Sequence, residues 1–410
     1  MGTITAGKQT SRAPEKPPTS ARTIFHRMKT VRIGIAGLGM GTLHANNILS
    51  GQIPRLELAA VADMDEARRA AFPGVKGFAT AEEMIGSGLI DAILVATPHY
   101  SHTPIGIAAL QAGLHVMMEK PLVVHKAEAR RLLDAHTGKK QVFAVMFNQR
   151  TDPYYRKIRE YIRNGDLGEV RRVNWIVTDW FRTEAYYASS AWRATWKGEG
   201  GGVLLNQCPH NLDMLQWLFG LPARVRAHAG FGRYHRIEVE DDVTAYIEFS
   251  NGATGVFVAS TGEAPGTNRL EITGERGRVV YENDRITFTQ NAAPMTQFSR
   301  VTAEAFARPA TTEHVFDAPD HGEQHAGILK NFTGAILDGE KLIAPASEGL
   351  ASVEIANAML LSAWLDKDIP FPLDAELYEK MLNQRIAISS APKVRKTVVN
   401  QPDFSKSFRR

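Results

Sequence analysis

The chain has 410 residues, 44% of them hydrophobic and 22% charged, a composition that excludes a largely disordered protein and has room for more than one domain. Its formal net charge of +4 arises at the two ends, because residues 1–29 and 391–410 are both rich in Lys and Arg. The body between them is mildly acidic, which argues against a nucleic-acid-binding surface.

Two further features limit the class of protein. The sequence has no run of about 18 apolar residues, so no membrane-spanning helix is expected. Cys208 is its single cysteine, which excludes a disulfide framework and leads us to expect a cytoplasmic protein. Residues 1–28 contain three prolines and lack the apolar stretch of a secretory signal, so they are interpreted as a disordered tail. Residues 391–410 are interpreted as a basic tail.

Short apolar runs alternate with helical segments in the first part of the chain. Strands are predicted at 31–36, 56–62, 92–96, 114–118 and 141–147, and helices at 42–49, 104–112 and 126–136. This alternation is typical of parallel strands joined by crossover helices. The sequence therefore predicts a doubly wound α/β domain of the Rossmann type over residues 29–150.

The second half has a different pattern and predicts an α+β domain over residues 151–390. Apolar and polar residues alternate over 243–249, and Asn251-Gly252, a strong hairpin signal, leads to a return strand at 253–261. Turns at 275–277 and 282–284 indicate further antiparallel strands, helices are predicted at 154–163, 324–337 and 347–365, and residues 291–320 are expected to be irregular.

A glycine-rich turn, Gly37-Leu38-Gly39-Met40, follows the first predicted strand and precedes a helix, as a dinucleotide fingerprint requires. Gly37 permits the tight turn and Gly39 lets the backbone approach a pyrophosphate. The helix N-terminus offers N–H groups and a partial positive charge. Thr42 stands in place of the third fingerprint glycine, with Gly41 one residue earlier. A purely structural turn is the alternative, but the preceding strand favours cofactor binding.

Asp63 ends the second predicted strand. A carboxylate at this position accepts hydrogen bonds from the adenosine ribose and repels a 2′-phosphate. Met64 and Asp65 follow it, rather than an arginine that could hold that phosphate. NAD is therefore predicted in preference to NADP. The alternative is that Asp63 only caps the next helix.

Two groups of polar residues are candidates for catalysis. Lys120, in Glu119-Lys120-Pro121, closes a strand at the sheet edge where open α/β sheets bind ligands. Burial near a nicotinamide cation would lower its pKa and let it exchange a proton with a substrate hydroxyl. After the glycine run at 200–202, a helix would place Asn206, His210 and Asp213 on one face. These three are interpreted as pocket residues, and a buried polar network is the alternative.

These motifs together resemble the Gfo/Idh/MocA family, named for glucose–fructose oxidoreductase and inositol dehydrogenase. The resemblance spans roughly residues 30–370. It rests on Gly34-Ile35-Ala36-Gly37-Leu38-Gly39 with His44, Ala96-Thr97-Pro98 with His102, Glu119-Lys120-Pro121, Trp192-Arg193, Gly200-Gly201-Gly202, His210 with Asp213, and Asn331-Phe332 with Ala335-Ile336 and Gly339. It implies a Rossmann domain, an open and mostly antiparallel sheet that often mediates dimers or tetramers, a nicotinamide cofactor, and a sugar or cyclitol substrate.

The resemblance also implies roles for single residues. Lys120 matches the family's catalytic lysine, and His210 matches the histidine that serves as acid and base. Many members have an aspartate four positions before that histidine, where this chain has Asn206, which can orient a hydroxyl but cannot relay a proton. The cofactor is expected to contact Gly37, Gly39, Met40, Asp63, Thr97, Pro98, His102, Glu119, Lys120, Trp192 and Arg193.

The predicted function is therefore an NAD-dependent oxidoreductase that transfers a hydride between nicotinamide and a hydroxyl or carbonyl carbon of a sugar, glycoside or cyclitol. One alternative is an NAD-dependent glycoside hydrolase that oxidises transiently and cleaves by elimination. The other is a non-catalytic nucleotide-binding sensor, against which the joint presence of Lys120 and His210 argues. A homodimer or homotetramer is expected, without nucleic acid, membrane or metal. His321 and His325 are four apart, but Gly322 favours a helix start over a zinc-binding helix.

Overall fold

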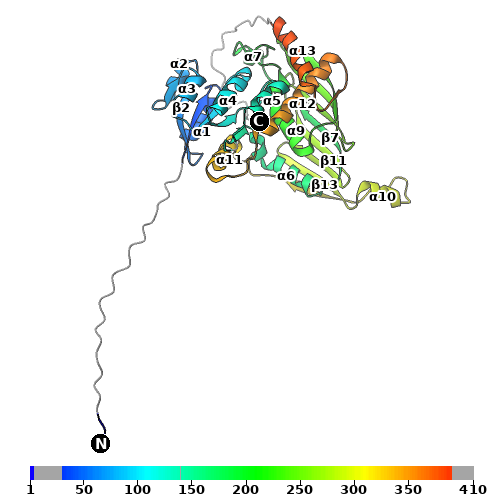
Figure 1. Ribbon diagram of the computed structural model, residues 1–410. Coiled ribbons are helices and arrows are strands. Elements are labelled where there is room, and N and C mark those ends of the chain that lie inside the picture. The colour runs from blue at the N-terminus through cyan, green and yellow to red at the C-terminus, as the bar shows by residue number, and fades with distance from the viewer. Residues whose placement is uncertain (4–29, 139, 390–410) are drawn as a thin grey trace.

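The computed structural model describes residues 1–3, 30–138 and 140–389, and two sheets dominate it (Figure 1). The expected tails therefore fall almost wholly outside the described residues. Within those residues, the structure has no helix that is long and apolar enough to span a membrane.

The N-terminal sheet has six parallel strands in the order β3-β2-β1-β4-β5-β6, the order of a Rossmann fold. Its strands are β1 (Val31–Ala36), β2 (Leu56–Ala62), β3 (Lys76–Phe78), β4 (Ala92–Val95), β5 (His115–Met118) and β6 (Phe143–Val145). Its helices are α1 (Gly41–Leu49), α2 (Glu66–Ala70), α3 (Ala81–Gly86), α4 (His102–Gln111) and α5 (Lys126–Asp134). The predicted doubly wound sheet is confirmed, and α2 is the helix expected after Asp63. The pattern missed β3 and α3, which are too short to show a period.

The second sheet has nine strands in the order β14-β13-β12-β11-β7-β10-β9-β8-β15. Its strands are β7 (Val170–Val177), β8 (Arg224–Phe231), β9 (Glu240–Glu248), β10 (Thr254–Ser260), β11 (Asn268–Gly274), β12 (Gly277–Glu282), β13 (Arg285–Asn291), β14 (Thr311–Phe316) and β15 (Ile369–Pro370). β7 and β10 are parallel and the other neighbours are antiparallel. This confirms the predicted open, mostly antiparallel sheet.

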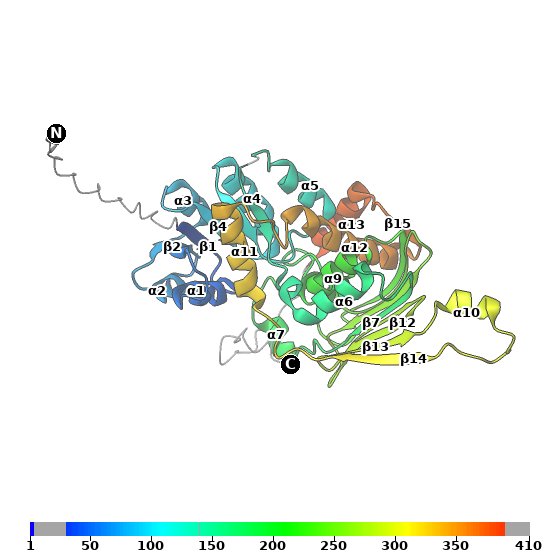
Figure 2. The ribbon, with the colours of Figure 1, turned by 90° about the horizontal axis from the view of Figure 1, so that it is seen from below.

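Helices cover one face of this second sheet (Figure 2). They are α6 (Pro153–Arg163), α9 (Pro209–Phe219), α12 (Ala346–Leu365) and α13 (Ala375–Ile388). Alternation along β7 shows the two faces, because Val173, Trp175 and Val177 are buried in the core shared with these helices, whereas Ile176 is 38% exposed. Among the described residues, no helix covers the second face of the sheet.

After the second sheet the chain returns to the first. Helix α11 (Gln324–Asp338) lies beside α1, and its Ile328, Leu329 and Phe332 belong to the core of the Rossmann sheet. The core thus combines segments that are distant in sequence. The domain boundary near Arg150 remains a prediction.

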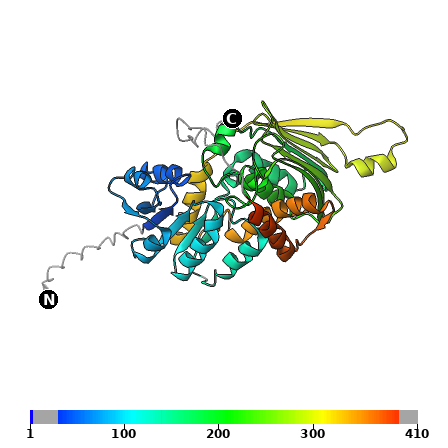
Figure 3. The ribbon, with the colours of Figure 1, turned by 90° about the horizontal axis from the view of Figure 1, so that it is seen from above.

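The expectation of an irregular segment at 291–320 was wrong. This stretch contains the edge strand β14 and α10 (Met295–Val301), which projects from the second sheet on the side away from the Rossmann sheet (Figures 2 and 3). Nearly all side chains of β14 are exposed, and α10 has no buried residue. Neither element therefore has the apolar alternation from which a strand or helix is predicted.

Candidate active site

A cleft of about 570 Å³ lies at the carboxyl ends of the Rossmann strands and extends to the start of α9. Ligands of open α/β sheets bind at this edge. All the residues predicted for the cofactor and for catalysis line this cleft: Gly37, Gly39, Met40, Asp63, Thr97, Pro98, His102, Glu119, Lys120, Trp192, Arg193, Asn206 and His210.

The turn after β1 depends on two glycines with different environments. Gly37 has a φ of +89°, and a Cβ atom there would lie 2.6 Å from the main-chain oxygen of Ala96. At Gly39 a Cβ would meet no atom within 4 Å. Gly37 is therefore required by the fold, whereas Gly39 leaves open space beside the cleft in which a ligand can approach the main chain.

The role of a third fingerprint glycine falls to Gly41, the first residue of α1. A Cβ at Gly41 would lie 2.7 Å from Cγ2 of Ile35, so its absence lets the helix pack closely on β1. Thr42 instead donates a side-chain hydrogen bond to the main-chain oxygen of Leu38 at 2.7 Å. Met40, the N-cap residue of α1, makes no side-chain capping bond, and of the first-turn N–H groups that of Leu43 donates to the main-chain oxygen of Met40 at 3.0 Å. The N–H groups of Gly41 and Thr42 are the ones offered to an anion.

Asp63 joins the end of β2 to the glycine turn. Its Oδ2 accepts the N–H of Leu38 at 2.7 Å, and its Oδ1 accepts the N–H of Asp65 at 2.9 Å. The N-cap of α2 is Asp65, which excludes the interpretation of Asp63 as the cap. Arg68 also lines the cleft, with its guanidinium 3.6 Å from the carboxylates of Asp63 and of Asp65. The sequence interpretation overlooked Arg68, because it considered only the residues directly after Asp63.

The end of β5 places two ionisable residues, Glu119 and Lys120, in the cleft. Lys120 Nζ donates to the main-chain oxygen of Asn206 at 2.8 Å, and burial lowers the pKa of Lys120. Glu119 Oε2 accepts the main-chain N–H of Lys120 at 3.0 Å, and a 2.6 Å hydrogen bond joins its Oε1 to Nε2 of His44. Burial alone would raise the pKa of Glu119, but the hydrogen bond and charge of His44 outweigh it and lower that pKa to about 2. A permanent carboxylate thus adjoins Lys120.

His102 connects the two loops that border the cleft. Its Nε2 lies 2.9 Å from the main-chain oxygen of Thr97, and its Nδ1 lies 3.0 Å from that of Pro121. The loops after β4 and β5 are therefore held together by one buried side chain. This explains how Thr97 and Pro98 are kept at the cleft wall beside Lys120.

The single helix expected after the glycine run is two helices, α8 (Val203–Asn206) and α9. Pro209 begins α9, as suits a residue without an N–H group. Asn206 and His210 line the cleft, but Asp213 does not, and the prediction that all three share a pocket face was wrong. Asp213 instead forms an ion pair with Arg150, with 2.6 Å between the charged atoms, and both side chains are completely buried. Asp213 is therefore part of the core.

The ring nitrogens of His210 are free to form hydrogen bonds with a ligand in the cleft. His210 is 3% exposed, and neither ring nitrogen has a hydrogen-bond partner among the described residues. Burial, followed by the charge of Lys120, puts the pKa of His210 well below its usual value. The ring is thus a neutral imidazole that can accept or donate one proton.

Several cleft residues were not predicted from the sequence. Of the aromatic residues before the glycine run, Trp180 and Tyr186 line the cleft, whereas Tyr187 and Trp196 are buried in the core of the second sheet. The hydroxyl of Tyr186 accepts hydrogen bonds from Arg193 at 2.8 Å and from the side chain of Gln207 at 3.2 Å. Arg182 and Gln207 also line the cleft. Their sequence signal was weak, since β7, which precedes Trp180 and Arg182, was not predicted.

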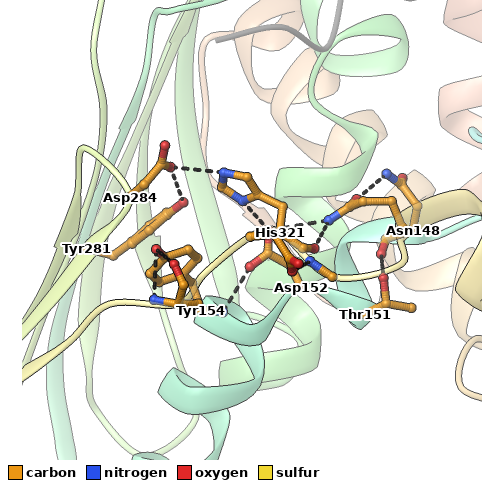
Figure 4. Close-up of polar contacts among 11 residues, drawn as sticks. Asn148, Thr151, Asp152, Tyr154, Tyr281, Asp284 and His321 are labelled. Atoms are coloured by element: carbon orange, nitrogen blue, oxygen red, sulfur yellow. Dashed lines mark hydrogen bonds and ion pairs between the residues drawn. The ribbon is translucent and has the colours of Figure 1, made fainter.

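The two histidines of the discounted zinc motif have separate contacts. His321 precedes α11, and its ring nitrogens lie 2.9 Å from the carboxylate of Asp152 and 3.4 Å from that of Asp284 (Figure 4). The ring of His325 instead packs against His44, with 5.4 Å between the ring centroids. The described residues contain no group of three His, Cys, Asp or Glu that could hold a metal ion. His321 thus links the start of α6 to the turn between β12 and β13.

Comparison with known proteins assigns this arrangement to a class. Residues 31–147 match the oxidoreductase family with an NAD-binding Rossmann fold, and residues 155–280 match the GFO/IDH/MocA C-terminal domain. The chain therefore belongs to the Gfo/Idh/MocA family of oxidoreductases, which confirms the resemblance seen in its motifs.

Three relatives illustrate the range of the family. Inositol 2-dehydrogenase of Rhizobium meliloti is 27% identical over 81% of this chain and 97% of its own length. Levoglucosan dehydrogenase of Pseudarthrobacter phenanthrenivorans is 27% identical over 68% of this chain and 80% of its own length. The WlbA dehydrogenase of Bordetella pertussis, solved in complex with NADH and UDP-GlcNAcA, is 26% identical, with a TM-score of 0.70 over 84% of this chain and all of that chain.

Proposed function

We propose that this protein is an NAD-dependent dehydrogenase that transfers a hydride between nicotinamide and a secondary hydroxyl or carbonyl carbon of a sugar, glycoside or cyclitol. One observation carries the proposal: a single cleft contains the glycine turn at one end and Lys120 with His210 at the other. The names of the inositol and levoglucosan dehydrogenases among its relatives support the substrate class.

The residues present fit a dinucleotide. Gly39 leaves space for a pyrophosphate at the start of α1, and Asp63 presents a carboxylate for the adenosine ribose. Thr97 and Pro98 would border the nicotinamide together with His102, Glu119, Trp192 and Arg193. When bound, the nicotinamide supplies the carbon that accepts or donates the hydride.

Lys120 and His210 would move the proton that accompanies the hydride. Lys120, with its lowered pKa, can take the proton of a substrate hydroxyl at Nζ, and the adjacent carboxylate of Glu119 favours the resulting ammonium. The neutral ring of His210 offers a second position for a proton on the same cleft wall. Asn206 cannot exchange a proton and would orient the hydroxyl through its amide.

Asp63 supports NAD over NADP. Its carboxylate would face the ribose and repel a 2′-phosphate. Arg68 could attract such a phosphate, but it is within 3.6 Å of two carboxylates, those of Asp63 and Asp65. Arg69 is a second cation at this point, because its guanidinium donates to the main-chain oxygen of Asp63 at 2.5 Å. The preference for NAD is therefore argued from the Asp63 carboxylate and not from a count of charges.

A homodimer or homotetramer would use the uncovered face of the second sheet. Tyr246, 44% exposed on β9, faces Val256 of the neighbouring strand, and Ile176, 38% exposed on β7, faces Val258. These four residues form an apolar stripe across three strands, and such exposed patches mark interaction surfaces. Size-exclusion chromatography coupled to light scattering would give the oligomeric state.

The proposal is tested by the appearance of NADH when purified protein receives NAD⁺ with myo-inositol, levoglucosan, free sugars or glycosides. A signal with one substrate class that disappears in Lys120→Ala supports the dehydrogenase. Cleavage of a glycoside that requires NAD⁺ but yields no net NADH would favour the hydrolase. Binding of NADH without turnover of any substrate would favour the sensor.

A further inference from the structure

Behind the cleft wall lies a buried carboxylate that contacts two segments of the wall at once. Glu199 is 2% exposed and does not line the cleft. Its Oε2 accepts the main-chain N–H of Ala194 at 2.6 Å, directly after Trp192 and Arg193. Its Oε1 accepts a hydrogen bond from Nδ2 of Asn206, the last residue of α8.

These contacts determine which end of the Asn206 amide faces away from Glu199. A carboxylate only accepts hydrogen bonds, so the amide nitrogen must point towards it. The amide oxygen Oδ1 then faces the hydroxyl of Tyr186, 3.4 Å away. Since that hydroxyl already accepts bonds from Arg193 and Gln207, its own hydrogen is directed towards Oδ1 or towards a ligand.

Asn206 therefore presents an acceptor in the most reactive part of the cleft. Its main-chain oxygen accepts the hydrogen bond from Nζ of Lys120 at 2.8 Å, so the residue that carries the amide is in contact with the proposed proton acceptor. A substrate hydroxyl that reached this point would find Oδ1 rather than the amide nitrogen.

We propose that Glu199 is a positioning residue that fixes the Asn206 amide with its oxygen towards the substrate, and thereby makes the site selective for a substrate hydroxyl that donates a hydrogen bond at this position. The inference rests on the proposed dehydrogenase function. A site built to bond a hydroxyl rejects analogues that lack it, so the corresponding deoxy compound would be a poor substrate.

The substitution Glu199→Gln tests this without changing the volume of the side chain. A glutamine has one acceptor oxygen, for which the N–H of Ala194 and the amide of Asn206 would compete. The N–H of Ala194 is fixed by the main chain, so the Asn206 amide is expected to turn its nitrogen to the cleft. With the best substrate of the panel above, kcat/KM is expected to fall roughly 10- to 100-fold, with unchanged affinity for NADH.

A second substitution should reverse this loss. In the double variant Glu199→Gln/Asn206→Asp, the new carboxylate can accept from the glutamine and still present an oxygen to the cleft. Asn206→Asp alone would place two carboxylates in contact and should be impaired. The double variant is therefore expected to be at least about 10-fold more active than either single variant, a rescue that a purely structural role does not produce.

Glu240→Gln is the matched control. Glu240 is equally buried in the same region, and its Oε1 accepts the N–H groups of Gly202 and Leu204, which a glutamine oxygen can also do. The kcat/KM of the Glu240→Gln variant should stay at the wild-type level. Full activity of Glu199→Gln, or a double variant no better than the singles despite an unchanged melting temperature, would overturn the role of Glu199 alone. A wild-type protein without turnover on any substrate would overturn the proposed function together with this inference.

Discussion

The two ends of the cleft are built in different ways. At the glycine turn, the geometry comes from the main chain, because the positive φ of Gly37 and the start of α1 place N–H groups at the cleft. At the other end, side chains from separate segments meet, with Lys120 after β5, Tyr186 on α7 (Glu184–Ala188) and His210 on α9. Local conformation thus determines the first end and tertiary packing the second.

This difference predicts which property each end controls. Main-chain N–H groups hold a ligand but exchange no proton, so changes at the glycine turn should act on cofactor affinity. The side chains at the other end include the titratable groups of the proposed reaction, so changes there should act on rate. The predictions below test this separation, from the largest expected effect to the smallest.

The largest effect is expected for His210→Gln. The variant keeps a polar side chain at the cleft but cannot exchange a proton, so kcat should fall on the order of 10²- to 10⁴-fold. The affinity for NADH, measured by fluorescence titration, should change little. His228 is exposed on β8, outside the cleft, and His228→Gln is the control with unchanged kcat. A His210→Gln variant with a weakened affinity for NADH and an intact kcat would contradict the division between the two ends.

The two glycines of the turn should separate cofactor affinity from stability. In Gly39→Ala the added Cβ meets no protein atom within 4 Å, so the melting temperature should hold while the Kd for NADH rises roughly 10-fold as the pyrophosphate is kept at a distance. In Gly37→Ala the Cβ would be 2.6 Å from the oxygen of Ala96 and φ is +89°, so the protein should also lose about 1–3 kcal/mol of stability. Equal melting temperatures for both variants would contradict this assignment.

The same contrast explains what could be predicted from the sequence. The Rossmann strands and the glycine turn follow from buried apolar runs and from a conformation that needs glycine, and both signals are local. Lys120 was a candidate because it ends a strand at the ligand-binding edge of the sheet, and His210 because helix spacing groups it with Asn206. The resemblance to a known family then implied their roles. The structure places both residues at the cleft, and the experiments above test their chemical roles.

The remainder of the site depends on contacts between distant segments. Lys120 contacts the main-chain oxygen of Asn206 across 86 positions of the chain. Glu199 contacts the side chain of Asn206 because the chain turns back within the seven positions that separate them, and the sequence pattern shows neither contact. Asp213 fits the spacing of a pocket residue, yet the break at Pro209 and the ion pair with Arg150 direct it into the core. The edge strand β14 was missed for a related reason, since solvent on its side chains removes the alternation.

A smaller effect, on the preference for NAD over NADP, is expected from a substitution at Asp63. Asp63→Asn removes one negative charge beside Arg68 while keeping an oxygen for the N–H of Leu38. The ratio of kcat/KM for NAD⁺ to that for NADP⁺ should fall roughly 10-fold, because the repulsion of a 2′-phosphate decreases. Glu57→Gln, which removes an exposed carboxylate from the same strand outside the cleft, is the control and should leave the ratio at the wild-type value. An unchanged ratio in Asp63→Asn would remove the argument for NAD.

Acid should affect the side-chain network more than the glycine turn. Burial lowers the pKa of His325 from 6.5 to about 4 and that of His99 from 6.5 to about 3. As the pH falls below 6.5, the unfolded chain binds protons at these rings and the folded protein does not, so the free energy of unfolding should decrease until the folded rings titrate as well. His325→Gln removes one of these sites, and its urea midpoint should therefore depend less steeply on pH between 6.5 and 4 than that of the wild type. Parallel curves for the two proteins would mean that His325 is charged in the folded state, in which case the ring beside His44 and Glu119 is part of an ion network rather than a neutral packing element.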